Sequence, residues 1–170
     1  MRLSLREQPV IKSAVYSAIC LGLLLFSYSF LPALGVFANT PTLLVAAVSS
    51  LALFEGPKYA GFFALIFSVL ETLMLGTNTL IFPLFYTAFA IVCTWLFESF
   101  FVKNYFAWLC YTLGGLLIHS VISLFAPVSS WGVIATDILL ETTLPTFAMS
   151  AVLSLPLYPL LKLAKKKTDK

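Results

Sequence analysis

Charged residues are scarce in this chain, and their scarcity excludes a water-soluble globular protein. Lysine and arginine contribute 10 of the 170 residues and aspartate and glutamate 7, whereas 61% of the residues are hydrophobic. A soluble domain usually carries about 25% charged residues. The mean hydropathy of +1.01 supports the same conclusion. The composition therefore predicts an all-α integral membrane protein, because long apolar segments cross a membrane as helices.

Histidine and cysteine are also scarce, which removes several kinds of site. The chain has one histidine, His119, and three cysteines, Cys20, Cys93 and Cys110, that stand singly in apolar segments. Their spacing gives neither a disulfide framework nor a set of metal ligands. The sequence contains no Gly-rich phosphate loop and no combination of serine, histidine and aspartate with loop support. We therefore expect no metal, no cofactor and no enzymatic activity.

The apolar residues form six segments, which predict a six-helix transmembrane bundle with very short loops. A membrane span needs roughly 20 predominantly apolar residues. The candidate spans lie at about 13–37, 41–54, 58–75, 79–101, 105–126 and 134–161. The second is the shortest, but Gly56 and Pro57 indicate a turn that separates it from the third. Residues 1–170 are thus expected to form a single polytopic membrane domain.

The basic residues can all be placed on one side of the membrane. They are Arg2, Arg6, Lys12, Lys58, Lys103, Lys162, Lys165, Lys166, Lys167 and Lys170. Basic connections remain in the cytoplasm, so six spans predict that both termini are cytoplasmic. The lysine cluster near the C-terminus is interpreted as a topology anchor. A nucleic-acid partner is not expected, because no basic domain with interleaved aromatic residues is present.

Four ionisable residues fall inside the predicted spans, where a charge near the bilayer centre costs at least ~2.5–3.5 kcal/mol. They are Glu71, His119, Asp137 and Glu141. The predicted topology places all four in the outer half of the bundle, so we expect an intramembrane polar cluster. It could bind a cationic solute, relay protons, contact a partner's helix, or join helices through a bond between His119 and a carboxylate. An intramembrane hydrolase that uses Glu71 and Asp137 is a further alternative.

Small residues recur on the third candidate span. Ala60, Ala64 and Ser68 are four positions apart, and Gly61 stands beside the first of them. Small residues let helix backbones approach closely in a membrane. The face they form could pack within the bundle or receive an external helix.

Two stretches of the chain carry a resemblance to a known family. The first joins the turn Glu55-Gly-Pro-Lys58 to the small residues at 60, 61, 64 and 68, and then to Glu71 and Gly76. It resembles the second and third spans of the rod shape-determining MreD family. The second stretch, Leu144-Pro145-Thr146 with the Pro156 break and the lysine-rich terminus, resembles the closing helix of that family. The chain length and minimal loops agree over nearly the whole sequence.

The resemblance implies a non-enzymatic membrane scaffold of the bacterial cell-elongation machinery, which maintains rod shape and directs peptidoglycan synthesis. The expected location is the bacterial cytoplasmic (inner) membrane. The expected partners are an MreC-like single-span protein, the RodA glycosyltransferase with its class B penicillin-binding transpeptidase, and indirectly the MreB filament. On this interpretation Ala60, Gly61, Ala64 and Ser68, or a neighbouring span, receive the helix of the MreC-like partner.

A second resemblance supports a different class of function. Ala14-x-x-x-Ala18 in the first span is similar to the docking motif of the substrate-binding components of energy-coupling-factor vitamin transporters. Such a component would bind a cationic, aromatic vitamin near the outer face, with Trp131 as a stacking or cation–π surface. The pocket residues would be Glu71, His119, Trp131 and Asp137. A carrier or flippase accessory for a lipid-linked precursor is a third interpretation, based on the polar cluster alone.

Overall fold

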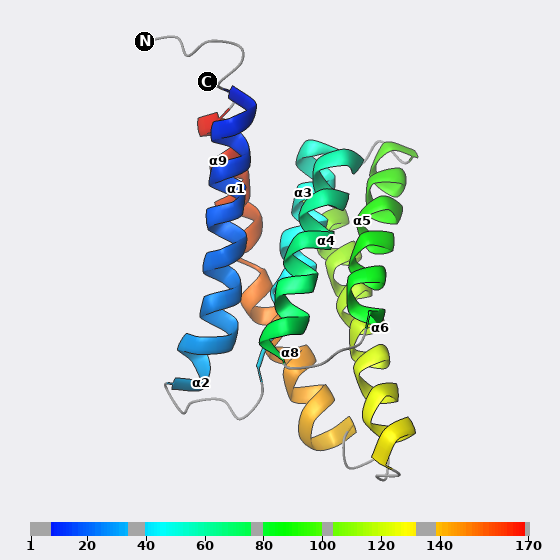
Figure 1. Cartoon of the computed structure of the whole chain (residues 1–170). Helices are drawn as coiled ribbons and strands as arrows, with labels where there is room; N and C mark the ends of the chain where they lie inside the picture. The colour runs from blue at the N-terminus through cyan, green and yellow to red at the C-terminus, as the bar shows by residue number, and fades with distance from the viewer. Residues whose placement is uncertain (1–7, 34–39, 76–79, 100–103, 132–138, 169–170) are drawn as a thin grey trace.

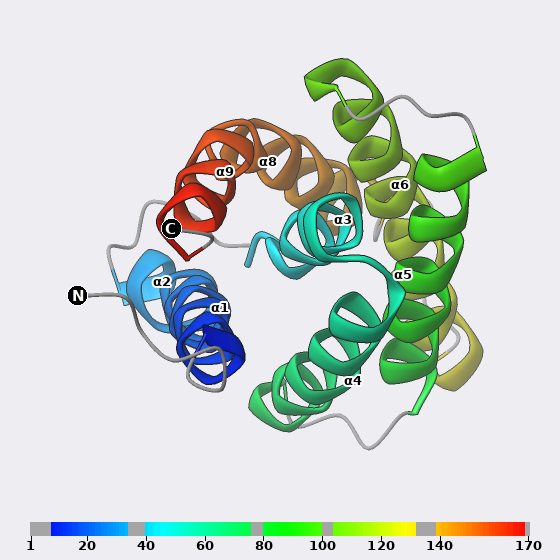
Figure 2. The ribbon, with the colours of Figure 1, turned by 90° about the horizontal axis from the view of Figure 1, so that it is seen from above.

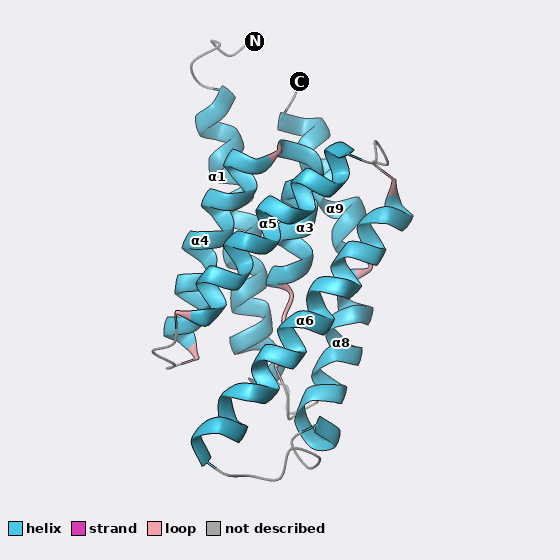
Figure 3. Ribbon diagram, turned by 90° about the vertical axis from the view of Figure 1, so that its right-hand side faces the viewer, coloured by secondary structure: helices cyan, strands magenta, loops and turns pink. Residues whose placement is uncertain are grey.

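The computed structural model describes residues 8–33, 40–75, 80–99, 104–131 and 139–168. Most of these residues form helices, and the described part contains no strand, as Figure 3 shows. The elements are α1 (Gln8–Leu25), η1 (Phe26–Phe30), α2 (Leu31–Ala33), α3 (Leu44–Glu55), α4 (Pro57–Met74), α5 (Ile81–Ser99), α6 (Tyr105–Trp131), η2 (Leu139–Thr143), α8 (Leu144–Ser154) and α9 (Leu157–Thr168). The predicted all-α class is therefore confirmed for this part of the chain.

Five helical segments are long and apolar enough to cross a membrane. They are Val10–Ala33, Pro57–Met74, Ile81–Ser99, Tyr105–Leu124 and Leu139–Lys166. The chain is thus a multi-pass helical membrane protein by the length and composition of its helices. The second predicted span, 41–54, corresponds to α3, which has 12 residues. At 1.5 Å per residue α3 is about 18 Å long, short against a hydrocarbon core of about 30 Å.

The short helix α3 occupies the centre of the bundle. It packs against α1, α4, α5, α6 and α9, and the view from above shows these helices arranged around it (Figure 2). Every residue from Leu44 to Leu53 is buried. A helix that is apolar on all sides is stable when it is enclosed by other elements, which explains why a segment shorter than the other spans forms a helix here.

The chain enters α3 through the non-helical residues 40–43, of which Pro41, Thr42 and Leu43 are buried. Non-helical backbone at membrane depth is tolerated where protein satisfies its polar groups. The amide N–H of Thr42 donates a hydrogen bond of 2.8 Å to the hydroxyl oxygen of Ser150 on α8. At the other end Gly56, with φ of 83°, allows the turn into α4.

Prolines account for the irregular turns in the first and the last of these five segments. The π-helical turn η1 ends two residues before Pro32, and η2 ends two residues before Pro145. Proline has no amide hydrogen, so it interrupts the regular pattern of helical hydrogen bonds. Pro156 similarly separates α8 from α9.

The helices alternate in direction, so that α1 begins and α9 ends at the same end of the bundle (Figure 1). The end of α3 and the start of α4 lie there too. We call this the basic end, because the described lysines stand at these helix ends. They are Lys12 near the start of α1, Lys58 at the start of α4, and Lys162, Lys165 and Lys166 in α9.

Candidate functional site

The small-residue face of α4 is covered by the chain itself. Ala60, Ala64 and Ser68 each have 0% of their surface exposed, and α4 packs against α3 and α5. Gly61 is half-buried, and a Cβ placed on it would meet no atom within 4 Å. Ala60, Ala64 and Ser68 thus pack inside the bundle, which is one of the two interpretations of their spacing. Binding of a partner helix by this set of residues stays a prediction.

A second row of small residues, on α1, is exposed. Ala14, Ala18 and Gly22 follow one another at intervals of four residues, and all three are exposed. No atom lies within 4 Å of a Cβ built on Gly22. On the opposite side of the helix Tyr16 and Cys20 are buried in the core. We call Ala14, Ala18 and Gly22 the α1 face.

Polar contacts attach α1 to the core at the basic end. The ammonium group of Lys12 lies 2.7 Å from Oε2 of Glu55, and the hydroxyl of Tyr16 donates a hydrogen bond of 2.7 Å to Oε1 of the same carboxylate. Lys165 of α9 donates a hydrogen bond of 2.7 Å to the backbone oxygen of Phe54. The first and last segments thus both hold the C-terminal end of α3.

Glu71 forms a second polar attachment deeper in the bundle. Its side chain is 2% exposed, and the hydroxyl of Tyr28 donates a hydrogen bond of 2.6 Å to its Oε1. Tyr28 also interacts with the side chain of Thr42. The hydroxyl of Tyr86 lies beside the carboxyl of Glu71, but neither it nor Oε2 makes a hydrogen bond in the described structure. The Glu71 cluster of Tyr28, Thr42, Glu71 and Tyr86 therefore joins η1, the entry to α3, α4 and α5.

His119 lies among aromatic rings rather than beside a carboxylate. The centroid of its ring is 5.2 Å from that of Phe82, 6.0 Å from that of Phe85 and 5.7 Å from that of Tyr86. Its Nδ1 is 3.5 Å from the hydroxyl of Ser123. Among the described contacts it forms no hydrogen bond to a carboxylate, so the helix-joining bond expected from the sequence is not seen. Tyr86 instead stands between His119 and Glu71.

Of the other predicted members of the polar cluster, only Glu141 lies among the described residues. Glu141 is exposed on η2, and its described contacts do not connect it with Glu71 or His119. Asp137 lies outside the described residues, as does the side chain of Trp131. The described residues also contain no group of three or more histidine, cysteine, aspartate or glutamate side chains that could hold a metal ion.

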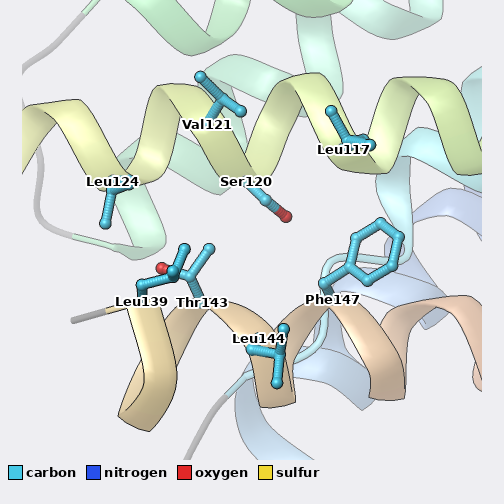
Figure 4. A pocket seen from close by; sticks show the side chains of 8 residues that line it. All are labelled: Leu117, Ser120, Val121, Leu124, Leu139, Thr143, Leu144 and Phe147. Carbon is cyan, nitrogen blue, oxygen red and sulfur yellow. The ribbon is translucent and has the colours of Figure 1, made fainter. Parts of the chain in front are cut away.

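An apolar crevice lies between α6 and the segment formed by η2 and α8. Its volume is about 260 Å³, and its walls are almost entirely apolar. Figure 4 shows side chains of both segments that line it. Its members include Leu117, Ser120 and Val121 on α6, and Thr143, Leu144 and Phe147 on the other wall. The later turns of α6 and the start of α8, which contribute its lining residues, lie toward the end of the bundle away from the basic end (Figure 1).

No protein-family model, curated protein or solved structure matches the chain. The fold and its contacts define a multi-pass helical membrane protein built around a short buried helix. The features of the described part that bear on function include the exposed α1 face, the buried Glu71 cluster and the apolar crevice.

Proposed function

We propose that the protein is a non-enzymatic membrane scaffold that binds other membrane proteins through the α1 face. The exposure of Ala14, Ala18 and Gly22 in a row is the observation that carries the proposal. Membrane helices associate largely by close packing, and small residues at four-residue intervals allow that approach. The two attachments of α1, at Glu55 and at Glu71, hold the opposite side of the helix to the core. These attachments therefore hold α1 in place with the α1 face directed away from the core.

The resemblance of the sequence to the MreD family indicates which kind of scaffold to propose. We propose an MreD-like subunit of the cell-elongation machinery, in the bacterial cytoplasmic membrane, whose direct partner is an MreC-like single-span protein. The RodA and class B transpeptidase pair would be further partners, and the MreB filament would be reached indirectly. A single transmembrane helix is the kind of partner that a straight row of small residues suits. The α1 face replaces the α4 face as the docking surface, because the α4 face is buried.

The proposal includes six spans with both termini in the cytoplasm. The gathering of lysines at the basic end supports a cytoplasmic position for that end. The short helix α3 would act as the second span, completed by the buried non-helical residues that precede it. Such a discontinuous span is compatible with a bilayer when neighbouring helices enclose it.

Replacement of Ala18 by leucine tests the α1 face. The larger side chain would keep a partner helix at a distance, so we expect recovery of an MreC-like protein from native membranes to fall about tenfold, the effect of ~1.4 kcal/mol. Ala88→Leu on α5 is the matched control, because Ala88 is also an exposed alanine within a candidate span. Equal recovery with both variants would contradict the proposal. Co-purification followed by quantitative mass spectrometry gives the measurement.

A second candidate function is the substrate-binding component of a vitamin transporter of the energy-coupling-factor type. The exposure of Ala14 and Ala18 favours it, since these residues form the similar docking motif. The crevice is poorly suited to a cationic vitamin, because its walls are almost entirely apolar. Ligand pockets usually orient such molecules with several polar groups. The same purification separates the two functions. A retained vitamin, or recovery of paired ATPases with a coupling membrane subunit, would replace the scaffold proposal.

A further inference from the structure

Two buried oxygen atoms of the Glu71 cluster have no hydrogen-bond partner in the described structure. They are Oε2 of Glu71 and the hydroxyl oxygen of Tyr86, and the two side chains are 2% and 0% exposed. The hydroxyl lies beside the carboxyl, so both atoms belong to one place in the core. Buried polar atoms without a partner are uncommon in native proteins, and a water or an ion often explains them. The pair therefore points to a bound species.

The other oxygen of the carboxyl indicates that Glu71 is ionised. The hydroxyl of Tyr28 donates a hydrogen bond of 2.6 Å to Oε1. Hydroxyl groups that donate to a charged carboxylate have bonds of about 2.5–2.7 Å, and the bond from Tyr28 lies within this range. An ionised group buried at membrane depth is costly unless a charge of the opposite sign compensates it.

The described lysines do not supply the compensating charge. They stand at the basic end, whereas Glu71 lies 14 positions after Pro57, the first residue of α4. This separation is about 21 Å by helical rise, too far for a lysine at the basic end to contact the carboxyl. His119 lies on the other side of Tyr86, and its described contacts do not include the carboxyl. None of the described basic side chains therefore compensates the carboxylate.

Two irregular backbone segments meet at the same carboxyl. Tyr28 belongs to the π-helical turn η1, and Thr42, which interacts with Tyr28, belongs to the non-helical residues 40–43. In secondary transporters, backbone carbonyls of interrupted helices help to coordinate Na⁺ near the bilayer midplane. Turns of π-helix also occur frequently at functional sites. The cluster thus combines a carboxylate, hydroxyl groups and irregular backbone in one place.

We infer that the Glu71 cluster binds one small monovalent cation, such as Na⁺, with Oε2 of Glu71 and the hydroxyl oxygen of Tyr86 among its ligands. Hard cations favour oxygen ligands, and a tyrosine hydroxyl has lone pairs to offer. One positive charge neutralises a single carboxylate, whereas a divalent ion would leave an uncompensated charge in the core. The inference departs from the sequence-based expectation that the chain holds no metal ion.

A cation at this position would connect the elements that the cluster joins, which are η1, the entry to α3, α4 and α5. Because these elements come together only in the folded bundle, the cation would bind the folded state and stabilise it. Glu71 stands three residues before Met74, the last residue of α4, so the shorter path for the ion leads from the end away from the basic end. The inference does not depend on the proposed scaffold function.

The first test measures how Na⁺ changes the thermal unfolding midpoint of the full chain in mild detergent. Sodium chloride is exchanged for N-methylglucamine chloride at constant pH and ionic strength, so that screening by salt stays the same. We expect the midpoint of the wild type to rise by about 3–6 °C when the Na⁺ concentration is ten times Kd. Glu71→Gln removes the charge and keeps the size of the side chain, so its midpoint should not respond to Na⁺. Glu141→Gln is the matched control, because Glu141 is an exposed glutamate in another candidate span, and it should keep the full response.

A second measurement applies even if Glu71→Gln fails to fold. The wild type should retain about one radioactive Na⁺ per chain, which unlabelled Na⁺ displaces and N-methylglucamine does not. Tyr86→Phe keeps the buried ring and removes the hydroxyl, so half-saturation should require at least threefold more Na⁺. Tyr105→Phe is the control, since Tyr105 is 41% exposed, and it should bind Na⁺ as the wild type does.

The inference is overturned if Na⁺ neither binds to the wild type nor raises its midpoint. Equal Na⁺ responses of folded Glu71→Gln and of Glu141→Gln would also overturn it, because the cation would then bind elsewhere. A midpoint that follows pH but not Na⁺ would show that a proton occupies Oε2 in place of a metal cation.

Discussion

At the scale of single residues, Glu71 is a carboxyl buried in the described core, with 2% of its surface exposed. Burial of a carboxyl costs free energy unless hydrogen bonds compensate. In the Glu71 cluster the hydroxyl of Tyr28 supplies such a hydrogen bond, which connects the end of the first segment with α4. The carboxyl of Glu71 therefore helps to hold in place the segment that carries the α1 face.

The hydrogen bond from Tyr28 to Glu71 gives a prediction for stability. Tyr28→Phe would leave Oε1 of the buried carboxyl without its donor, which costs about 1–3 kcal/mol of unfolding free energy. Tyr105→Phe is the control, since Tyr105 is 41% exposed and its hydroxyl makes no hydrogen bond in the described structure. Reversible unfolding in mixed micelles measures both variants. The interpretation fails if Tyr28→Phe is no less stable than Tyr105→Phe.

Tyr86 shows what residue-level sequence reasoning missed. The sequence directed attention to ionisable side chains within the spans, and it identified Glu71 and His119. It could not show that a tyrosine of another span contacts both, because that contact depends on how α4, α5 and α6 are placed around α3. A tyrosine near the middle of an apolar segment was the available signal, although the same residue commonly serves packing alone.

At the scale of elements, α3 depends on side chains from its neighbours along its whole length. Ser150 accepts a hydrogen bond at its entry and Lys165 donates one at its end. In between, the indole of Trp108 donates a hydrogen bond of 2.8 Å to Ser50. Since α3 is too short to resemble the other spans, these contacts and its complete burial are what stabilise it in the centre.

The approach of α5 and α3 to α6 gives a prediction at this scale. A Cβ at Gly115 would lie 2.4 Å from the ring of Phe89 and 2.8 Å from Val45 of α3. We expect Gly115→Ala to lower the unfolding free energy by about 1–3 kcal/mol through overpacking. Gly114→Ala is the control, since a Cβ there meets no atom within 4 Å. It should be neutral or stabilise the helix by up to ~1 kcal/mol. Similar effects of both changes would contradict the described packing.

The rows of small residues show why element-level predictions from sequence were incomplete. The spacing of Ala60, Ala64 and Ser68 predicted a closely packed face, and the face is closely packed. The sequence did not identify the neighbour, because the same spacing suits an internal and an external helix. Ala14 and Ala18 have the same pattern and are exposed. The packing of the helices decides which of the two rows is buried. That Gly22 extends the exposed row of Ala14 and Ala18 is likewise known only from the fold.

At the scale of the whole molecule, the bundle surrounds one short central helix and has a basic end. The described lysines lie at the ends of α1, α4 and α9 that meet there (Figure 1). Composition alone predicted membrane insertion, and the charge pattern predicted which connections share a side. The prediction of six spans depends most on α3, because 12 helical residues do not by themselves establish a span. Its crossing is therefore the decisive question for the proposed topology.

Reporter fusions across α3 and α4 answer that question. Six spans require Thr40 outside, Gly56 at the cytoplasmic basic end and Leu75 outside, because the basic end is retained in the cytoplasm. Alkaline phosphatase, which is active only outside the cytoplasm, should be active when fused after Thr40 or Leu75 and at least tenfold less active after Gly56. A fluorescent protein fused after Lys170 should fluoresce. If the fusions after Thr40 and Gly56 report the same side, α3 does not cross. Five spans would then separate the two ends of the chain, although α1 begins and α9 ends at the same end of the bundle.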